Sequence, residues 1–460
     1  MQPGRATCYK LRVDFLADMA WGEALRAAAS SSLASTLAAF GLILLLTRLR
    51  VPLSLGILAG AVTLGLLDGQ SVGEVLRRAG LGAVQPGTIG LLVVVVLMLA
   101  LSEAMRRAGQ LDEIVSLAGG FLRRPAVAMA ALPALIGLMP MPGGAQLSAP
   151  MVDAASGGAR VSPERLSAIN YWFRHIWEHF WPLYPGVIVA MSLTGSDVGA
   201  FVLHQFPLGI FMAASGLLIF RGSHPDLHRT ASRAAAGQGR RLLRATSTIW
   251  IILLVWAAVR GAMAYLGDLP ARGGAWGAVG RYAPLAVALA VSLTWTVRMN
   301  RLGRAQLLAI ARHRPIYKLA GIVVCVMVFW YTIHQAGSAG RIADELAALH
   351  VPGEVVVALL PLIAGLVTGL AVGFVGTSFP IALAVIAARG DAGSIRPYVA
   401  LAYAFGHIGQ MLSPLHVCQV VSNEYFGARP RGVYRRLIPS IAITAACAVA
   451  YFLFLRWVLA

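Results

Sequence analysis

The chain has 460 residues, of which 58% are hydrophobic and only 12% are charged, and its mean hydropathy is +0.73. A water-soluble domain carries about 25% charged residues, so this chain has too few to face water on all sides. The net charge of +19 comes from arginines between apolar segments, where cytoplasmic loops and anionic lipid explain it better than nucleic acid. Continuous apolar runs also exclude an outer-membrane barrel, whose strands alternate. We therefore predict an all-α, multi-pass protein of the cell inner membrane.

Residues 1–32 mix charged and apolar side chains, which fits an amphipathic leader on the membrane surface or a start codon placed too far upstream. Spans then follow in two sets. The first set of predicted helices is Leu33–Leu46, Pro52–Leu67, Gly87–Met105, Ala126–Met139, Ile169–Met191 and Phe201–Phe220. The second is Thr248–Tyr265, Tyr282–Val297, Leu319–Gln335, Glu354–Val372, Val399–Val421 and Leu437–Val458.

Two stretches between these spans, about 140–156 and 373–388, are punctuated by glycine and proline. Irregular backbone survives at membrane depth only where protein or a water-filled cavity satisfies it, so both are predicted to be re-entrant hairpins. Arginine-rich loops at 221–244, 298–318 and 428–436 are predicted to be cytoplasmic. The chain then divides into repeat 1 (33–220), a basic cytoplasmic linker (221–247) and repeat 2 (248–460).

An internal repeat supports this division. The segment that begins at Tyr171, YWFRHIWEHFWPL, aligns without a gap with YAFGHIGQMLSPL from Tyr403, which lies 232 residues later. Leu-Pro and Ser-x-Pro pairs match at nearly the same offset. Given the cytoplasmic loops, the matched helices run in opposite directions across the membrane. The sequence therefore predicts two inverted repeats of about six helices each, an arrangement typical of secondary transporters.

The first aligned segment contains H-x-x-E-H, the inverted zinc-peptidase pattern, at His175, Glu178 and His179. A membrane-embedded zinc metallopeptidase is thus an alternative function. The second repeat keeps the histidine, as His407, and a helix-breaking proline seven residues later, but not the glutamate or the second histidine. The shared features are therefore a histidine and the helix breaks at Pro182 and Pro414, so we assign no metal ligands.

Ionisable residues inside a bilayer are expensive and indicate function. His175, Glu178 and His407 are candidates for a proton relay, because imidazole titrates near physiological pH. The alternative for the first cluster is an aromatic belt at headgroup depth, since Tyr171, Trp172 and several other aromatic residues crowd the same stretch. Three of the four cysteines fall in apolar segments and are predicted to be small buried side chains.

The predicted hairpin tips are the second group of candidates. Helix N-termini that follow such tips direct positive dipole ends at a bound anion, and unwound carbonyls there could hold Na⁺. The alternative is that glycine and proline only permit close helix packing. The candidate substrate-binding residues are Gly143, Gly144, Gln146, Ser148, Gly376, Thr377 and Ser378.

This layout resembles the ion transporter superfamily, which includes divalent-anion/sodium symporters and citrate and gluconate permeases. Within it, MPMPGGAQLSAPM resembles the integral membrane family called domain of unknown function 401. The resemblance covers nearly the whole chain and implies opposed hairpins, broken helices, a substrate site between the tips, homodimers and elevator-like movement. The Ser-Asn-Thr tip motif of the symporters is absent.

The sequence predicts a secondary active transporter for a small, anionic, carboxylate-type solute, coupled to H⁺ or Na⁺, rather than an enzyme. Its predicted partners are that solute and membrane lipid, with no cofactor beyond the coupling ion. A channel or structural scaffold is the remaining alternative.

Overall fold

The computed structural model describes residues 31–122, 124–139, 144–157, 161–221, 237–265, 274–335, 338–388 and 395–459. All regular elements within these ranges are helices. Those long and apolar enough to cross a membrane are Pro86–Arg107, Val198–Phe220, Ser247–Tyr265, Gly277–Met299, Arg304–Gln335 and Pro430–Leu459. The predicted all-α membrane protein is confirmed. The predicted leader falls outside the described ranges except for its last two residues.

The two halves contain the same kinds of helix in the same order. The first half comprises α2 (Ser32–Arg48), α3 (Leu53–Leu67), α4 (Val72–Val84), α5 (Pro86–Arg107), α6 (Gln110–Gly119), α7 (Pro125–Gly137), α8 (Ala145–Ala155), α9 (Pro163–Arg174), α10 (Pro185–Thr194) and α11 (Val198–Gly216), which the 3-10 turn η1 (Leu217–Phe220) extends. The short α12 (Gln238–Ala245) leads into the second half. This comprises α13 (Ser247–Tyr265), α14 (Gly274–Met299), α15 (Arg304–Ala311), α16 (Arg314–Gln335), α17 (Ser338–Ala348), α18 (Gly353–Thr368), α19 (Ala371–Ala388), α20 (Ile395–Leu412), α21 (Val417–Phe426) and α22 (Pro430–Leu459).

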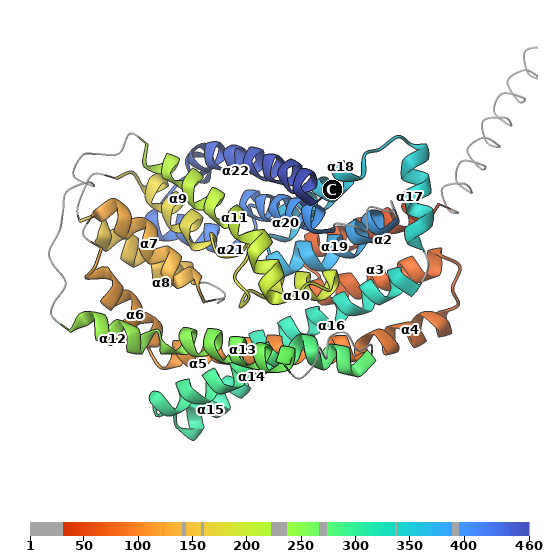
Figure 1. The fold of residues 1–460 in the computed structure, drawn as a ribbon. Coiled ribbons are helices and arrows are strands. Elements are labelled where there is room, and N and C mark those ends of the chain that lie inside the picture. Colours follow the sequence, from red (N-terminus) through yellow and green to blue (C-terminus); the bar gives the residue numbers. More distant parts are fainter. Residues whose placement is uncertain are drawn as a thin grey trace, which may run out of the picture.

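Figure 1 shows how the helices are layered. The long helices α5, α13 and α14 pack together on one side, while α11, α20 and α22 pack together on the other. Between them, the halves exchange partners: α10 of the first half packs against α19 of the second, and α21 of the second packs against α8 of the first. These two contacts are equivalent, because α10 corresponds to α21 and α19 to α8 under the repeat. Each half therefore packs its own helices against those of the other around a common centre.

A close approach of backbones repeats in both halves. A Cβ atom added at Gly137 in α7 would overlap the carbonyl oxygen of Arg174, at the end of α9. A Cβ at Gly365 in α18 would overlap the carbonyl oxygen of Gly406 in α20. Arg174 and Gly406 are equivalent in the aligned repeat, so each half uses a glycine to bring its hairpin against its broken helix.

The predicted hairpins differ from the observed ones, because both stretches are largely helical. The range 145–155 is helix α8, and the first part of the predicted hairpin, residues 140–143, lies outside the described residues. In the second half, α19 runs unbroken from Ala371 to Ala388 and includes Pro380. The turn lies earlier, at Gly369, whose φ of +63° is a left-handed conformation that glycine adopts without strain. The sequence therefore placed this turn too late.

Candidate functional site

Both aligned segments are interrupted helices that meet in the middle of the molecule. In the first half, α9 ends at Arg174 and α10 begins at Pro185; in the second, α20 ends at Leu412 and α21 begins at Val417. Pro182 and Pro414, which the sequence analysis placed at helix breaks, lie within these interruptions. A proline has no N–H to donate and its ring clashes with the preceding turn, so both residues disfavour helix at these positions, although α19 accommodates Pro380 within a continuous helix.

Glu178 and Gln410 are equivalent residues of the two repeats, and they contact each other. The Gln410 amide Nε2 donates to Glu178 Oε2 over 2.7 Å, across a separation of 232 residues that equals the repeat offset. Two equivalent residues touch only where the pseudo-two-fold axis passes between them. This buried hydrogen bond therefore marks the axis and places the only carboxylate of the pair at the centre of the interface between the halves.

The three residues predicted for a proton relay lie together at this axis. His175 Nε2 is 3.8 Å from Glu178 Oε1, and His407 Nε2 is 3.7 Å from Glu178 Oε2. All three side chains are buried. The two equivalent histidines thus flank one carboxylate on its two oxygens, at distances longer than a hydrogen bond.

Two of the aromatic residues beside this cluster belong to the protein core, while Trp177 and Trp181 are partly exposed. Tyr171 and Trp172 are almost completely buried, and the Trp172 indole donates to the Met212 carbonyl over 2.9 Å. Neither side chain faces lipid, so they do not form the interfacial belt that was the alternative explanation of this stretch.

Three further polar residues complete the cluster: Arg174, which stands beside His175 in the sequence but was not assigned to the proton relay, and His416 and Cys418, which were not predicted. Arg174 is buried, and its Nη1 lies 3.5 Å from Cys418 Sγ at the start of α21. The His416 ring packs edge-on against His175, with centroids 4.7 Å apart. The repeat gave no sign of His416 and Cys418, because their equivalents in the first half are Tyr184 and Gly186.

A cavity of about 220 Å³ lies against this cluster. Its wall includes the first two residues of three helices, α10, α19 and α21, one from the first half and two from the second. Arg174, Glu178 and Gln410 also line it. Each helix N-terminus contributes the positive end of its dipole, and α19 and α21 also place backbone N–H groups there, whereas α10 begins with Pro185, which has none. Most of the lining is apolar, with Leu99, Leu319 and Ile322 among its residues, while the helix N-termini and Arg174 supply positive groups and Glu178 a negative one.

The hairpin residues predicted to bind substrate lie elsewhere. Gly143 is outside the described residues, Gly144 precedes α8, and the Gln146 side chain is exposed. The hydroxyl of Ser148 donates to the Gly144 carbonyl within its own helix. Gly376, Thr377 and Ser378 lie inside α19, and the two hydroxyls donate to carbonyls one turn earlier, at 2.8 and 2.6 Å. The cavity instead meets the second hairpin at Leu370–Val372.

The residues of H-x-x-E-H do not form one metal site. Residues 175–184 are not helical, so His175 and His179 do not project side by side from one helix face. The His179 ring packs on His407, with centroids 4.2 Å apart, whereas His175 faces His416. The ligand set that the metallopeptidase alternative requires is therefore not assembled.

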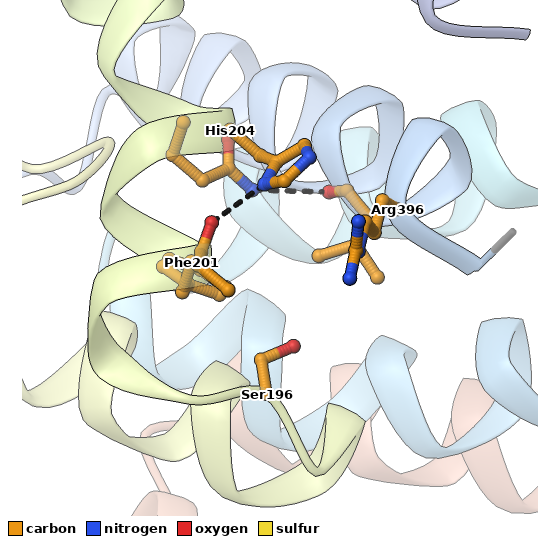
Figure 2. Close-up of a pocket in the computed structure, with 7 residues that line it drawn as sticks. Ser196, Phe201, His204 and Arg396 are labelled. Carbon is orange, nitrogen blue, oxygen red and sulfur yellow. Dashed lines mark hydrogen bonds between the residues drawn. The ribbon is translucent and has the colours of Figure 1, made fainter. Parts of the chain in front are cut away.

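A second, smaller pocket lies between α11 and the start of α20 (Figure 2). It holds about 20 Å³, room for about one water molecule. His204 and Arg396 line it, and His204 Nδ1 is already 2.6 Å from the Ala200 carbonyl. Its size excludes an organic solute, so the cavity at the axis is the candidate site.

Comparisons with known proteins agree with this architecture. The family model described as "Protein of unknown function (DUF401)" matches residues 29–236 and 282–455, which correspond to the two halves. No curated protein matches the chain. Among solved structures, the YdaH transporter of Alcanivorax borkumensis is similar, with a TM-score of 0.53 and 14% identity over 79% of this chain and 85% of that one. At this identity the likeness shows a shared fold.

Proposed function

This chain belongs to the DUF401 family, and we propose that it is a secondary active transporter that moves a small, carboxylate-type anion across the cell inner membrane. The single observation that carries this proposal is the cavity at the pseudo-two-fold axis, where three helix N-termini and the buried Arg174 converge. Free N–H groups and positive helix ends bind anions, and a guanidinium adds a planar pair of donors that matches a carboxylate.

The position of the cavity supports transport rather than a closed binding site. Its lining comes from both halves, and the discontinuous helices of inverted-repeat transporters hold their substrates at such an interface. Movement of one part of the protein against the other, of the elevator type that the resemblance implies, would open the cavity to each side in turn. The similar fold of the YdaH transporter and membership of the ion transporter superfamily, suggested by the sequence, are consistent with this movement.

Transport is proposed to be coupled to H⁺ or Na⁺. Glu178, flanked by His175 and His407, would carry the proton, whereas the helix breaks offer backbone carbonyls to Na⁺. We further propose that the protein forms a homodimer. We also propose that the hairpin tips take part in substrate binding, since Leu370–Val372, at the turn of the second hairpin, line the cavity.

The proposal is tested by the melting temperature of the purified protein against organic acids and inorganic anions, with and without Na⁺ and at two pH values. A ligand that binds only the folded state adds about 2.7 kcal/mol of stability at 100 times its dissociation constant. We expect one class of carboxylate to raise the melting temperature, and Na⁺ or low pH to enhance the shift.

Arg174→Gln should abolish that shift and reduce uptake of the same anion into proteoliposomes. Arg174→Lys keeps the charge and should retain part of both. The exposed Arg77, which pairs with Glu74 in α4, provides the matched control Arg77→Gln. The proposal fails if no anion stabilises the protein, or if Arg174→Gln binds and transports the anion as the wild type does.

A further inference from the structure

Two histidines and one cysteine gather on one wall of the central cavity. One donor atom each from His175, His416 and Cys418 lies within 4.8 Å of the other two, and all three side chains are buried. The three residues come from both halves: His175 from the break after α9, and His416 and Cys418 from the start of α21. Folding of both halves together is therefore needed to bring these donors to one point.

Backbone carbonyls orient the two imidazole rings. His175 Nδ1 is 2.5 Å from the Tyr171 carbonyl, and His416 Nδ1 is 3.3 Å from the Gln410 carbonyl. A carbonyl accepts only, so Nδ1 carries the proton in both neutral rings and each Nε2 keeps a free lone pair. His175 Nε2 has no hydrogen-bond partner among the described residues. The same carbonyl-to-Nδ1 contact fixes the tautomer of histidines that bind metals.

From this geometry we propose that His175, His416 and Cys418 bind a thiophilic d¹⁰ cation of the Zn²⁺ type in a three-ligand site. Imidazole nitrogen and thiolate sulfur are the donors that such ions prefer, and three protein ligands leave the fourth tetrahedral position open. Binding replaces the thiol proton, which leaves to solvent, by a metal–sulfur bond. The donors need to approach by about 1 Å, a change that side-chain rotation at the break can supply.

The open position would face the cavity, because all three residues line it. The Cys418 thiolate and the ionised Glu178 each carry one negative charge, and Arg174 carries one positive charge. The net charge around the donors is therefore −1. A bound divalent cation changes this net charge to +1. A single carboxylate at the open coordination position of the metal would then neutralise it. This last consequence, metal-assisted anion binding, rests on the proposed transport function; binding of the metal itself does not.

The site is tested with Co²⁺, which substitutes for Zn²⁺ and gives a charge-transfer absorption when bound to thiolate. The full-length protein is purified in detergent without a histidine tag and titrated with Co²⁺ alone. We expect one equivalent to bind with a thiolate charge-transfer band, and Zn²⁺ to displace it. Absence of the band in the wild-type protein overturns the proposal whatever the variants do.

Two variants assign the band to Cys418. Cys418→Ser should remove it and weaken metal binding by more than about 10–100-fold, which is the effect of losing a group that only supports a ligand. A protein in which Cys8, Cys325 and Cys447 are all replaced by serine keeps only Cys418 and should retain the band. The proposal is wrong if the band survives Cys418→Ser or disappears from the Cys418-only protein. The titration contains no carboxylate solute, so its result does not depend on transport. The metal site can therefore be confirmed even if the transport proposal fails.

Discussion

The two helix breaks occupy equivalent places in the two halves but carry different chemistry. The first, residues 175–184, holds Glu178 and follows the buried Arg174; the second, residues 413–416, has neutral residues at and around it. At the axis, Glu178 meets Gln410 where strict symmetry would place two carboxylates 2.7 Å apart. Two buried like charges at that distance strongly disfavour each other. The repeat thus preserves the order of the helices but not the length of the break, since residues 407–412 remain in α20. The side chains at the axis also diverge, because only one charge fits there.

The largest effect is expected from restoring symmetry at the axis. Gln410→Glu places a second carboxylate beside Glu178 and removes its hydrogen-bond donor, so we expect a loss of about 3–5 kcal/mol in the free energy of unfolding. The melting temperature in detergent measures this loss.

The exchanged protein, Glu178→Gln with Gln410→Glu, is the matched control. It again has one carboxylate and one amide on the axis, so most of the lost stability should return. If the exchange variant is as unstable as Gln410→Glu alone, the two positions are not interchangeable and the axis has been misplaced.

An intermediate effect is expected at the repeated close approach. Gly137→Ala and Gly365→Ala each insert a methyl group against a backbone carbonyl. Such overpacking should lower the free energy of unfolding by about 1–3 kcal/mol. Equivalent packing predicts similar losses for the two variants by thermal unfolding. Gly321 in α16 has open space around it, so Gly321→Ala should leave stability unchanged or slightly raised. A large loss of stability for one of these two variants and none for the other would contradict the structural equivalence of the two hairpins.

A smaller effect should distinguish α17 from its counterpart α6. Glu345 accepts hydrogen bonds from the Ser32 and Leu33 N–H groups at 2.9 and 2.8 Å, and so caps α2. Its repeat equivalent, Glu113 in α6, is exposed. Glu345→Gln should lower stability by about 1 kcal/mol, as loss of a helix cap does. Glu113→Gln should change it by less than about 0.5 kcal/mol. Equal effects of the two substitutions would contradict this assignment.

The effect of Glu345 should also depend on pH. Partial burial opposes ionisation of Glu345, but the hydrogen bonds from Ser31, Leu33 and Ser32 outweigh it, so its pKa lies below the ordinary value of 4.5. The ionised group therefore stabilises the folded protein at neutral pH. That contribution is lost as the pH falls from about 4.5 through the lowered pKa. The difference in melting temperature between wild type and Glu345→Gln should shrink over this range; a difference independent of pH would mean that the carboxylate charge does not matter.

The sequence by itself determined the class of protein and its symmetry. Bilayer-length apolar segments are readable one at a time, because the bilayer imposes length and composition on each span separately. The repeat and the proline positions are likewise local patterns, and Glu178, His175 and His407 stood out because ionisable residues in apolar surroundings are rare. Short amphipathic helices such as α4, α6 and α17 were missed, since connecting helices of this kind carry no span-length apolar run.

Only the tertiary structure decided what the site contains. The glycine-rich stretch after Leu370 resembles a turn locally, yet packing in the interior stabilises it as helix α19, and its hydroxyls are satisfied within that helix. His416 and Cys418 were not identified because a cysteine in an apolar segment has the same local pattern whether it is inert or a ligand. They join His175 and Arg174 only because the two halves interlock about an axis. Contacts between residues more than 230 positions apart depend on that assembly, which no single segment of the sequence encodes.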